Sequence, residues 1–368
     1  MKKQRRSRQS GQVLVMVVGG MIALIAATGF VVDAGFAFAE QRSTQNSADS
    51  ASRAGAVVLA RRAADPTTLT DAQWDEEVRN AVLNASLVNK TTVLEQRYTD
   101  WQGAALPGNP AVGSGGVPPD AAGVRVVTQK RPGTYLIRVV GFNAWDIRQE
   151  ATSVSGPTAA CIEVPGSCIL LPITFPVTVY ECALGNTSVP LEQAWDPGQE
   201  ITLPLCGGNP GSVGWIDWDP PSGGTDEIVD DVKNPPAVSV PLPSWKYITQ
   251  TGGLSSAPLE GALNAYIGQT VQVPFFDSTC QTEPVGNEIE GCSEEGGTGV
   301  GQWYHIPKIL SFKLTQAYTN GDNRDICGEY AQQCLVGSFV SFITQGTVGA
   351  PCVGTCPFGT TFAVQLIK

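Results

Sequence analysis

The chain has 368 residues, 42% of them hydrophobic, so it holds enough apolar material for a sizeable core. Its net charge of −11 is unevenly spread: residues 1–156 carry 17 Lys and Arg against 13 Asp and Glu (+4), whereas residues 157–368 carry 6 against 21 (−15). Because the acidic C-terminal part would repel a phosphate backbone, this composition argues against nucleic acid as a partner.

The first feature along the chain is an uncharged run from Val13 to Val32 that follows a basic leader, residues 1–11. At ~1.5 Å of rise per residue, a helix of this length spans about 30 Å, the thickness of a bilayer's hydrocarbon core. The positive-inside rule then keeps the leader in the cytoplasm and exports the rest of the chain. A cleaved signal peptide is the alternative, because residues 37–39 (AFA) have a small-x-small pattern. Its apolar core is usually only ~7–15 residues long, which favours an anchor.

The helical pattern continues beyond the apolar run, so residues 12–62 are predicted to form one helix, half in lipid and half in water. The polar half carries a stripe of mostly small apolar residues: Ala48, Ala51, Gly55, Val58 and Leu59. Such a stripe either lets a partner helix come close or seats the helix on its own chain. The apolar half offers a helix-packing surface of small residues: Gly19, Gly20, Ala23 and Ala27.

The stretch GQVLVMVVGGMIALIAATGFVVDAGFAFAEQRSTQNSADSASRAGAVVLA resembles the N-terminal segment of TadE/TadG-like Flp pilus-assembly proteins. Gly11-Gln12 opens the apolar run, residues 32–35 (VDAG) close it, and residues 45–51 (QNSADSA) lead into an Ala-rich stretch. The resemblance implies a bacterial cytoplasmic-membrane protein of the tight-adherence (Tad) secretion and pilus system. It would cross the membrane once, with its N-terminus inside.

The leader departs from the pattern that a prepilin peptidase cuts, which is a small residue followed by an apolar run with Glu at its fifth position. Gly11 is the small residue here, but the fifth position after it is Met16. The sequence therefore favours an uncut membrane anchor and leaves cleavage after Gly11 open. It also lacks the D-x-S-x-S metal motif of the von Willebrand-type domain that some TadG proteins carry.

A small α+β unit is predicted over residues 63–156. Thr70 and Gln73 form a capping-box pattern at the start of an amphipathic helix over residues 71–88. Residues 105–123 are rich in Pro and Gly and are predicted to form a loop. Three strand-like runs follow: VRVVTQ, TYLIRVV and WDIRQEATS.

Residues 157–368 are predicted to form a mainly β domain, because short apolar runs alternate with Gly and Pro turns. These runs are CILLPITFPVTVY, EITLPL, TVQVPFFD, HIPKILSFKLTQAY and LVGSFVSFITQ. Two short helices are expected among them. One would run from Thr225 as N-cap to Asn234, and the other from Ser256 as N-cap to Gly268.

All the cysteines lie in this domain: Cys161, Cys168, Cys182, Cys206, Cys280, Cys292, Cys327, Cys334, Cys352 and Cys356. An even number beyond a membrane anchor indicates disulfides in an oxidising compartment. Zinc is the alternative, but only the last two cysteines are closely spaced and the chain has a single histidine. The order along the chain predicts five local bridges: Cys161–Cys168, Cys182–Cys206, Cys280–Cys292, Cys327–Cys334 and Cys352–Cys356.

No catalytic residue, cofactor site or metal site is predicted. His305 lies in a strand-like run and is interpreted as structural. Asp217 and Asp219 would share one face of a strand and could act as an acid–base pair, as in glycoside hydrolysis. Calcium at the NGDNRD loop (Asp322, Asn323 and Asp325) also stays open, because hard cations prefer clustered oxygens.

The predicted architecture is a long N-terminal transmembrane α-helix, a small α+β unit and a mainly β extracytoplasmic domain with disulfides. The predicted function is that of a membrane-anchored, non-enzymatic component of a Tad/Flp-type pilus or tight-adherence secretion apparatus. Its partners would be the membrane and other proteins of that apparatus, bound through the N-terminal helix. The alternative is a membrane-anchored surface binding module or adhesin outside any pilus.

Overall fold

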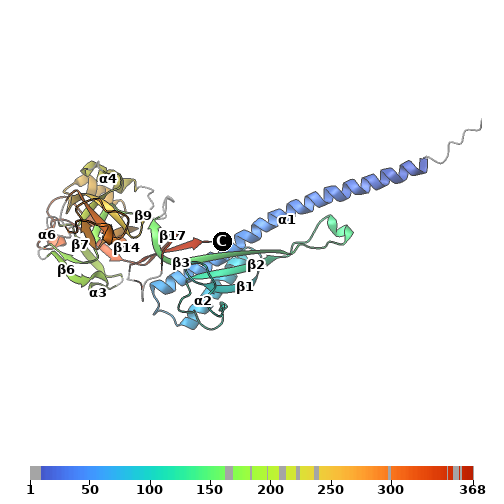
Figure 1. Cartoon of the computed structure of the whole chain (residues 1–368), viewed down its shortest axis with the longest axis horizontal. Coiled ribbons are helices and arrows are strands. Elements are labelled where there is room, and N and C mark those ends of the chain that lie inside the picture. The colour runs from blue at the N-terminus through green and yellow to red at the C-terminus, as the bar shows by residue number, and fades with distance from the viewer. Residues whose placement is uncertain are drawn as a thin grey trace, which may run out of the picture.

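A computed structural model describes most of the chain, namely residues 10–161, 169–182, 185–196, 198–206, 213–220, 224–235, 240–296, 300–345, 347–350, 356 and 359–367. The long helix predicted at the N-terminus is present as α1, Ser10–Ala64. At 1.5 Å per residue its 55 residues extend over roughly 80 Å. Its N-terminal half projects away from the rest of the molecule (Figure 1).

Helix α2, Asp71–Val88, begins and ends at the residues that the sequence pattern predicts. The capping box is complete, because the Thr70 side chain accepts a hydrogen bond from the Gln73 backbone while the Gln73 side chain accepts one from the Thr70 backbone. The apolar face of α2 is buried through Trp74, Val78 and Val82. These side chains share a core cluster with the polar half of α1 and the first sheet.

The described strands of the first sheet number seven, in the order β1-β2-β3-β18-β16, with β17 and β9 pairing along the extended end of β3. The strand β1 is not among the predicted elements, because its mixed sequence TVLEQRYT lacks a clear apolar alternation. The bounds are β1 Thr92–Thr99, β2 Gly123–Lys130, β3 Ile147–Cys161, β9 Val240–Pro241, β16 Phe342–Gln345, β17 Thr347–Val348 and β18 Thr361–Leu366.

The run TYLIRVV was predicted to be a strand, and this prediction is wrong. Residues 134–136 form a loop, and Ile137–Val140 form a short 3₁₀ helix, η1. The backbone N–H groups of Tyr135, Leu136 and Ile137 all bind the carboxylate of Asp33 on α1 instead of a neighbouring strand. The pattern of the run itself gives no sign of that distant acceptor.

The predicted division of the chain at residue 156 falls inside strand β3. Strand β18 returns from the C-terminal end of the chain and pairs antiparallel with β3, with Phe362 opposite Pro157 and Leu366 opposite Ser153. The C-terminus therefore lies beside α1, near the middle of the molecule, while the second sheet lies at the end opposite to the apolar half of α1 (Figure 1). The first sheet thus combines strands from both sides of the predicted boundary.

The second sheet confirms the mainly β character of the C-terminal part. Its described strands follow the order β12-β13-β10-β8-β4-β11-β14-β15-β7, and β5 and β6 form a separate hairpin. The bounds are β4 Ile173–Pro176, β5 Thr178–Glu181, β6 Gly185–Pro190, β7 Glu200–Pro204, β8 Gly214–Asp217, β10 Ser244–Thr251, β11 Thr270–Phe276, β12 Ser278–Cys280, β13 Gln302–Ile306, β14 Lys308–Tyr318 and β15 Cys334–Phe339.

Short helices accompany this sheet: α3 Leu191–Ala194, α4 Thr225–Lys233, α5 Ala257–Asn264, η2 Ile289–Gly291 and α6 Arg324–Cys327. The helices expected from Thr225 and Ser256 are present, but α5 ends at Asn264 and not at Gly268 as predicted. Ser256 is the N-cap of α5 and accepts a hydrogen bond from the Leu259 backbone. In α4 the N-cap is Gly224 rather than Thr225, which is the first helical residue.

Disulfides join Cys182–Cys206, Cys280–Cys292 and Cys327–Cys334, which are three of the pairs that the local spacing predicts. Cys356 is also disulfide-bonded. Cys168 and Cys352 lie outside the described residues, so the pairs Cys161–Cys168 and Cys352–Cys356 stay predictions.

Candidate functional site

The apolar half of α1 is the first candidate functional surface, and it is long and apolar enough to cross a membrane. Its large side chains are exposed, including Leu14, Ile22 and Leu24. A Cβ added at Gly19 or Gly20 would meet no atom within 4 Å. These two glycines, with Ala23 and Ala27, lie on a helix surface that no other described part of the chain covers. Their role in packing against another helix stays a prediction.

The polar half of α1 is covered by its own chain, which decides between the two interpretations of its small-residue stripe. Ala48 and Ala51 are fully buried, and Val58 and Leu59 are nearly so. A Cβ placed on Gly55 would lie 3.0 Å from Val124 of β2 and 3.1 Å from Val82 of α2. The stripe therefore packs α1 against α2 and the first sheet, and it is not a surface left open for a partner helix.

The junction between the two halves of α1 is built around Asp33, whose side chain is 1% exposed. One carboxylate oxygen accepts the backbone N–H of Tyr135 at 2.9 Å. The other accepts those of Leu136 at 2.9 Å and Ile137 at 2.7 Å. The ring of Phe36 contacts that of Tyr135 edge-on at 5.0 Å. The loop between β2 and β3 is thus fixed to the helix at the end of the apolar run.

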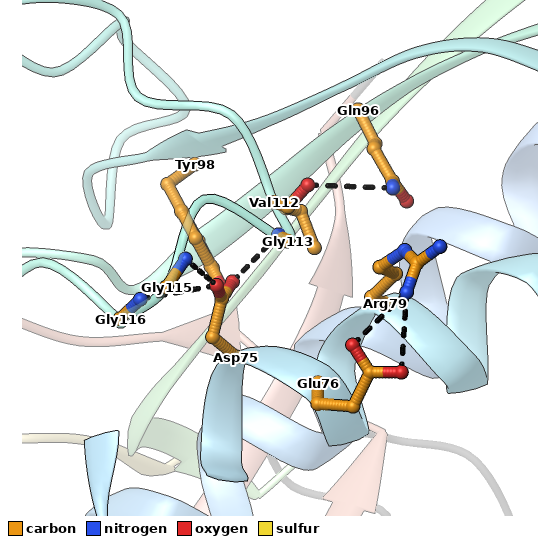
Figure 2. A network of polar contacts seen from close by, with 9 residues as sticks. All are labelled: Asp75, Glu76, Arg79, Gln96, Tyr98, Val112, Gly113, Gly115 and Gly116. Carbon is orange, nitrogen blue, oxygen red and sulfur yellow. Dashed lines mark hydrogen bonds and ion pairs between the residues drawn. The ribbon is translucent and has the colours of Figure 1, made fainter. Parts of the chain in front are cut away.

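A second buried carboxylate, Asp75 of α2, holds the Gly-rich loop predicted over residues 105–123 (Figure 2). It accepts hydrogen bonds from the backbone N–H groups of Gly113 at 2.7 Å, Gly115 at 2.6 Å and Gly116 at 3.1 Å. The Tyr98 hydroxyl donates a further bond at 2.6 Å. Burial, followed by the bond to Asp75, raises the pKa of Tyr98, so its hydroxyl keeps its proton and remains a donor.

Asp33 and Asp75 were not among the predicted site residues. Each accepts three backbone N–H groups from a segment distant in sequence, and carboxylates are the strongest acceptors for such groups. The available signals were a single carboxylate directly after a long apolar run and a glycine-rich loop that needs acceptors for its N–H groups. Both residues position the unit that carries the long helix.

The single histidine, His305, lies in strand β13 and is 4% exposed. The sequence pattern predicted a structural role for it. Its Nδ1 lies 2.6 Å from the Asp277 carboxylate, its Nε2 lies 3.1 Å from the Asn287 carbonyl oxygen, and its ring contacts Trp245. Both ring nitrogens of His305 are therefore engaged by the chain itself.

Asp217 and Asp219 lie close together, but not as two residues of one strand, as predicted: β8 ends at Asp217, and Asp219 lies in the bend that follows. Glu227 of α4 joins them. Burial raises the pKa of Asp217, which is 3% exposed. Burial and the carboxylates around it, first that of Glu227, raise the pKa of the nearby Asp231 to about 6. Negative charge is thus concentrated where β8 ends and α4 begins.

Comparisons with known proteins bear on the N-terminal segment. Residues 11–62 match a family model described as putative Flp pilus-assembly TadE/G-like. No curated protein and no solved structure matches the chain. The matched range covers nearly all of α1, with both its apolar half and the half that packs on α2 and the first sheet. The long helix of this chain is therefore similar to the TadE/G-like family over residues 11–62, where the resemblance of its sequence predicts it.

Proposed function

We propose that the chain is a membrane-anchored, non-enzymatic component of a Tad/Flp-type pilus or tight-adherence secretion apparatus. The observation that carries the proposal is the division of the TadE/G-like segment into two halves. One half is apolar and exposed, and the other is buried against α2 and the first sheet. Such a helix fixes a folded unit rigidly to a membrane, with the N-terminus inside and the β domain on the extracytoplasmic side.

The helix-packing surface at Gly19, Gly20, Ala23 and Ala27 supports contact with other helices of the apparatus. Small residues allow close approach of helix backbones, and close approach is what drives association in a bilayer. At 3.6 residues per turn these four residues share one side of the helix, whereas Val18 faces the opposite side. The two sides can therefore be tested against each other.

Gly20→Leu is expected to lower the number of surface pili at least tenfold when it replaces the native chain in its host, because added bulk keeps neighbouring helices apart. Pili counted by electron microscopy and chain level measured in the membrane fraction give the readout. Val18→Leu is the matched control and should leave both unchanged. Normal piliation in a strain that lacks the chain would refute the pilus role and favour an adhesin or binding module.

The orientation is tested separately by protease added to cells with a permeable envelope and an intact cytoplasmic membrane. Digestion of the β domain with protection of the leader is the expected result. Protection of the β domain would show that the proposed orientation is wrong.

A further inference from the structure

The chain has two clusters of acidic residues that could bind a cation, and the structure shows that they differ. At the NGDNRD loop the carboxylate of Asp322 is already bound by the guanidinium of Arg324, with Nε 2.9 Å from one oxygen and Nη2 2.5 Å from the other. A cation there would compete with a positive charge of the chain itself.

The second place has a different arrangement. Asp217 is the last residue of β8, Asp219 follows it in the turn, and Glu227 lies in the first turn of α4. One carboxylate oxygen from each lies within 4.8 Å of the others. Two oxygens on opposite sides of a calcium ion, each at ~2.4 Å from it, are also about 4.8 Å apart. The three groups are therefore no farther apart than ligands of one shared ion can be.

The state of Asp217 points to a ligand independently of that spacing. Its side chain is 3% exposed, and its Oδ1 accepts the backbone N–H of Asp219 at 3.0 Å. Its Oδ2 is buried and has no hydrogen-bond partner among the described residues. A buried carboxylate oxygen without a donor is costly, and a bound cation would offset that cost.

We propose that Asp217, Asp219 and Glu227 bind a divalent cation of the calcium type. The three side chains offer only oxygen ligands, which suit a hard cation, and backbone carbonyl groups and water can complete its shell. The ion would tie the end of β8 to the start of α4, whose Ile228 and Val232 belong to the main core cluster. Its role would be to stabilise the β domain.

The test is binding of Ca²⁺ to the full chain in detergent. Binding is followed by the melting temperature and by the luminescence of bound terbium. Tryptophan can excite that luminescence, because Trp218 lies between Asp217 and Asp219 in the sequence. Calcium is expected to raise the melting temperature by several degrees and to displace terbium. Asp217→Asn, or Glu227→Gln if the first variant does not fold, should weaken binding at least tenfold. The control Asp322→Asn should leave it unchanged. Absence of a calcium effect on the native chain, or loss of binding in the control alone, would overturn the site.

A different observation concerns the loop between β2 and β3, residues 131–146. Leu136 lies so close to α1 that a Cβ added to Gly29 would be 2.9 Å from the Cβ of Leu136. Gly29 is three residues inside the apolar run that ends at Val32, which is about 4.5 Å along the helix axis. The loop therefore reaches past the end of the run, and Figure 1 shows the β2–β3 hairpin extending beside α1 in the direction of its apolar half.

The loop presents side chains that suit a membrane interface. Tyr135, Leu136 and Phe142 are 58%, 48% and 65% exposed, although each is large and apolar or aromatic. The loop, residues 131–146, also carries Arg131 and Arg138 against one acidic residue, Asp146, a net charge of +1. Aromatic rings prefer the headgroup level, and positive side chains are attracted to anionic lipids.

We infer that residues 131–146 insert into the outer-leaflet interface of the membrane that α1 crosses. The inference rests on the proposed membrane anchoring of α1 and adds a second contact with the lipid. Two contacts would hold the first sheet at a fixed height and restrict rotation about the helix axis. Asp33 supplies the rigid link between them through its three backbone hydrogen bonds.

Spin labels on single cysteines test this contact in the full chain, reconstituted into vesicles of phosphatidylethanolamine and phosphatidylglycerol. A label on Phe142→Cys should be reached by oxygen and protected from a water-soluble nickel complex. Val285→Cys, whose native side chain is 85% exposed in the β domain, should show the opposite. Leu24→Cys reports on the helix. Protection at position 24 with nickel access at 142 refutes the loop contact alone, whereas nickel access at both refutes the anchoring as well.

Discussion

Asp75→Asn is expected to destabilise the folded chain by about 3–4 kcal/mol, because it removes the buried charge that organises the Gly-rich loop. The carboxylate accepts three backbone N–H groups and the Tyr98 hydroxyl (Figure 2). An amide keeps one acceptor oxygen and places its own N–H₂ group against donors. Buried N–H groups left without an acceptor cost ~1–3 kcal/mol each.

The measurement is the change in unfolding free energy of the full chain in detergent, followed by tryptophan fluorescence. Glu76→Gln is the matched control, because Glu76 is the next residue in α2 and its exposed carboxylate pairs with Arg79 at 3.0 Å. An exposed ion pair is worth only ~0.2–1 kcal/mol, so the control should change little. Similar losses for the two variants would show that the buried network does not hold the loop.

The sequence predicts those parts of the fold that depend on local signals. The capping box at Thr70 and Gln73 marks the start of α2, Ser256 marks the start of α5, and apolar runs mark most strands of the second sheet. In each case the residues that decide the structure are close together along the chain. Their patterns are therefore visible without knowledge of the fold.

The elements that could not be predicted depend on partners distant in sequence. Asp33 and the residues of the β2–β3 loop are about a hundred positions apart, and Asp75 is about forty positions from its glycine donors. The failure at TYLIRVV follows from this, because the acceptor that draws its N–H groups out of a strand lies on another element. The return of β18 to the first sheet is likewise a long-range pairing that no local pattern records.

The small-residue stripe of α1 shows a further limit. Small apolar residues at helical spacing indicate close packing but do not identify what packs against them. In the polar half the structure supplies the answer, because α2 and β2 cover Gly55. In the apolar half no described residue lies within 4 Å of a Cβ at Gly19 or Gly20, so the same pattern there stays a prediction of contact with another chain.

Gly55→Leu is expected to destabilise the folded chain by about 3 kcal/mol, since a well-packed core resists added bulk. A single added Cβ would already lie 3.0 and 3.2 Å from atoms of Val124 and 3.1 Å from Val82, and leucine adds three more carbons. Replacing a helical glycine gains at most ~1 kcal/mol of helix propensity, which does not offset this loss.

Gly35→Leu is the matched control, because Gly35 lies in the same helix and a Cβ there would meet no atom within 4 Å. Thermal unfolding of the full chain in detergent should show a melting temperature about 5–10 °C lower for Gly55→Leu and unchanged or slightly higher for Gly35→Leu. If the stripe bound a partner chain instead of α2 and β2, the isolated protein would tolerate leucine at both positions. Equal melting temperatures for the two variants would therefore contradict the seating of α1 on its own domain.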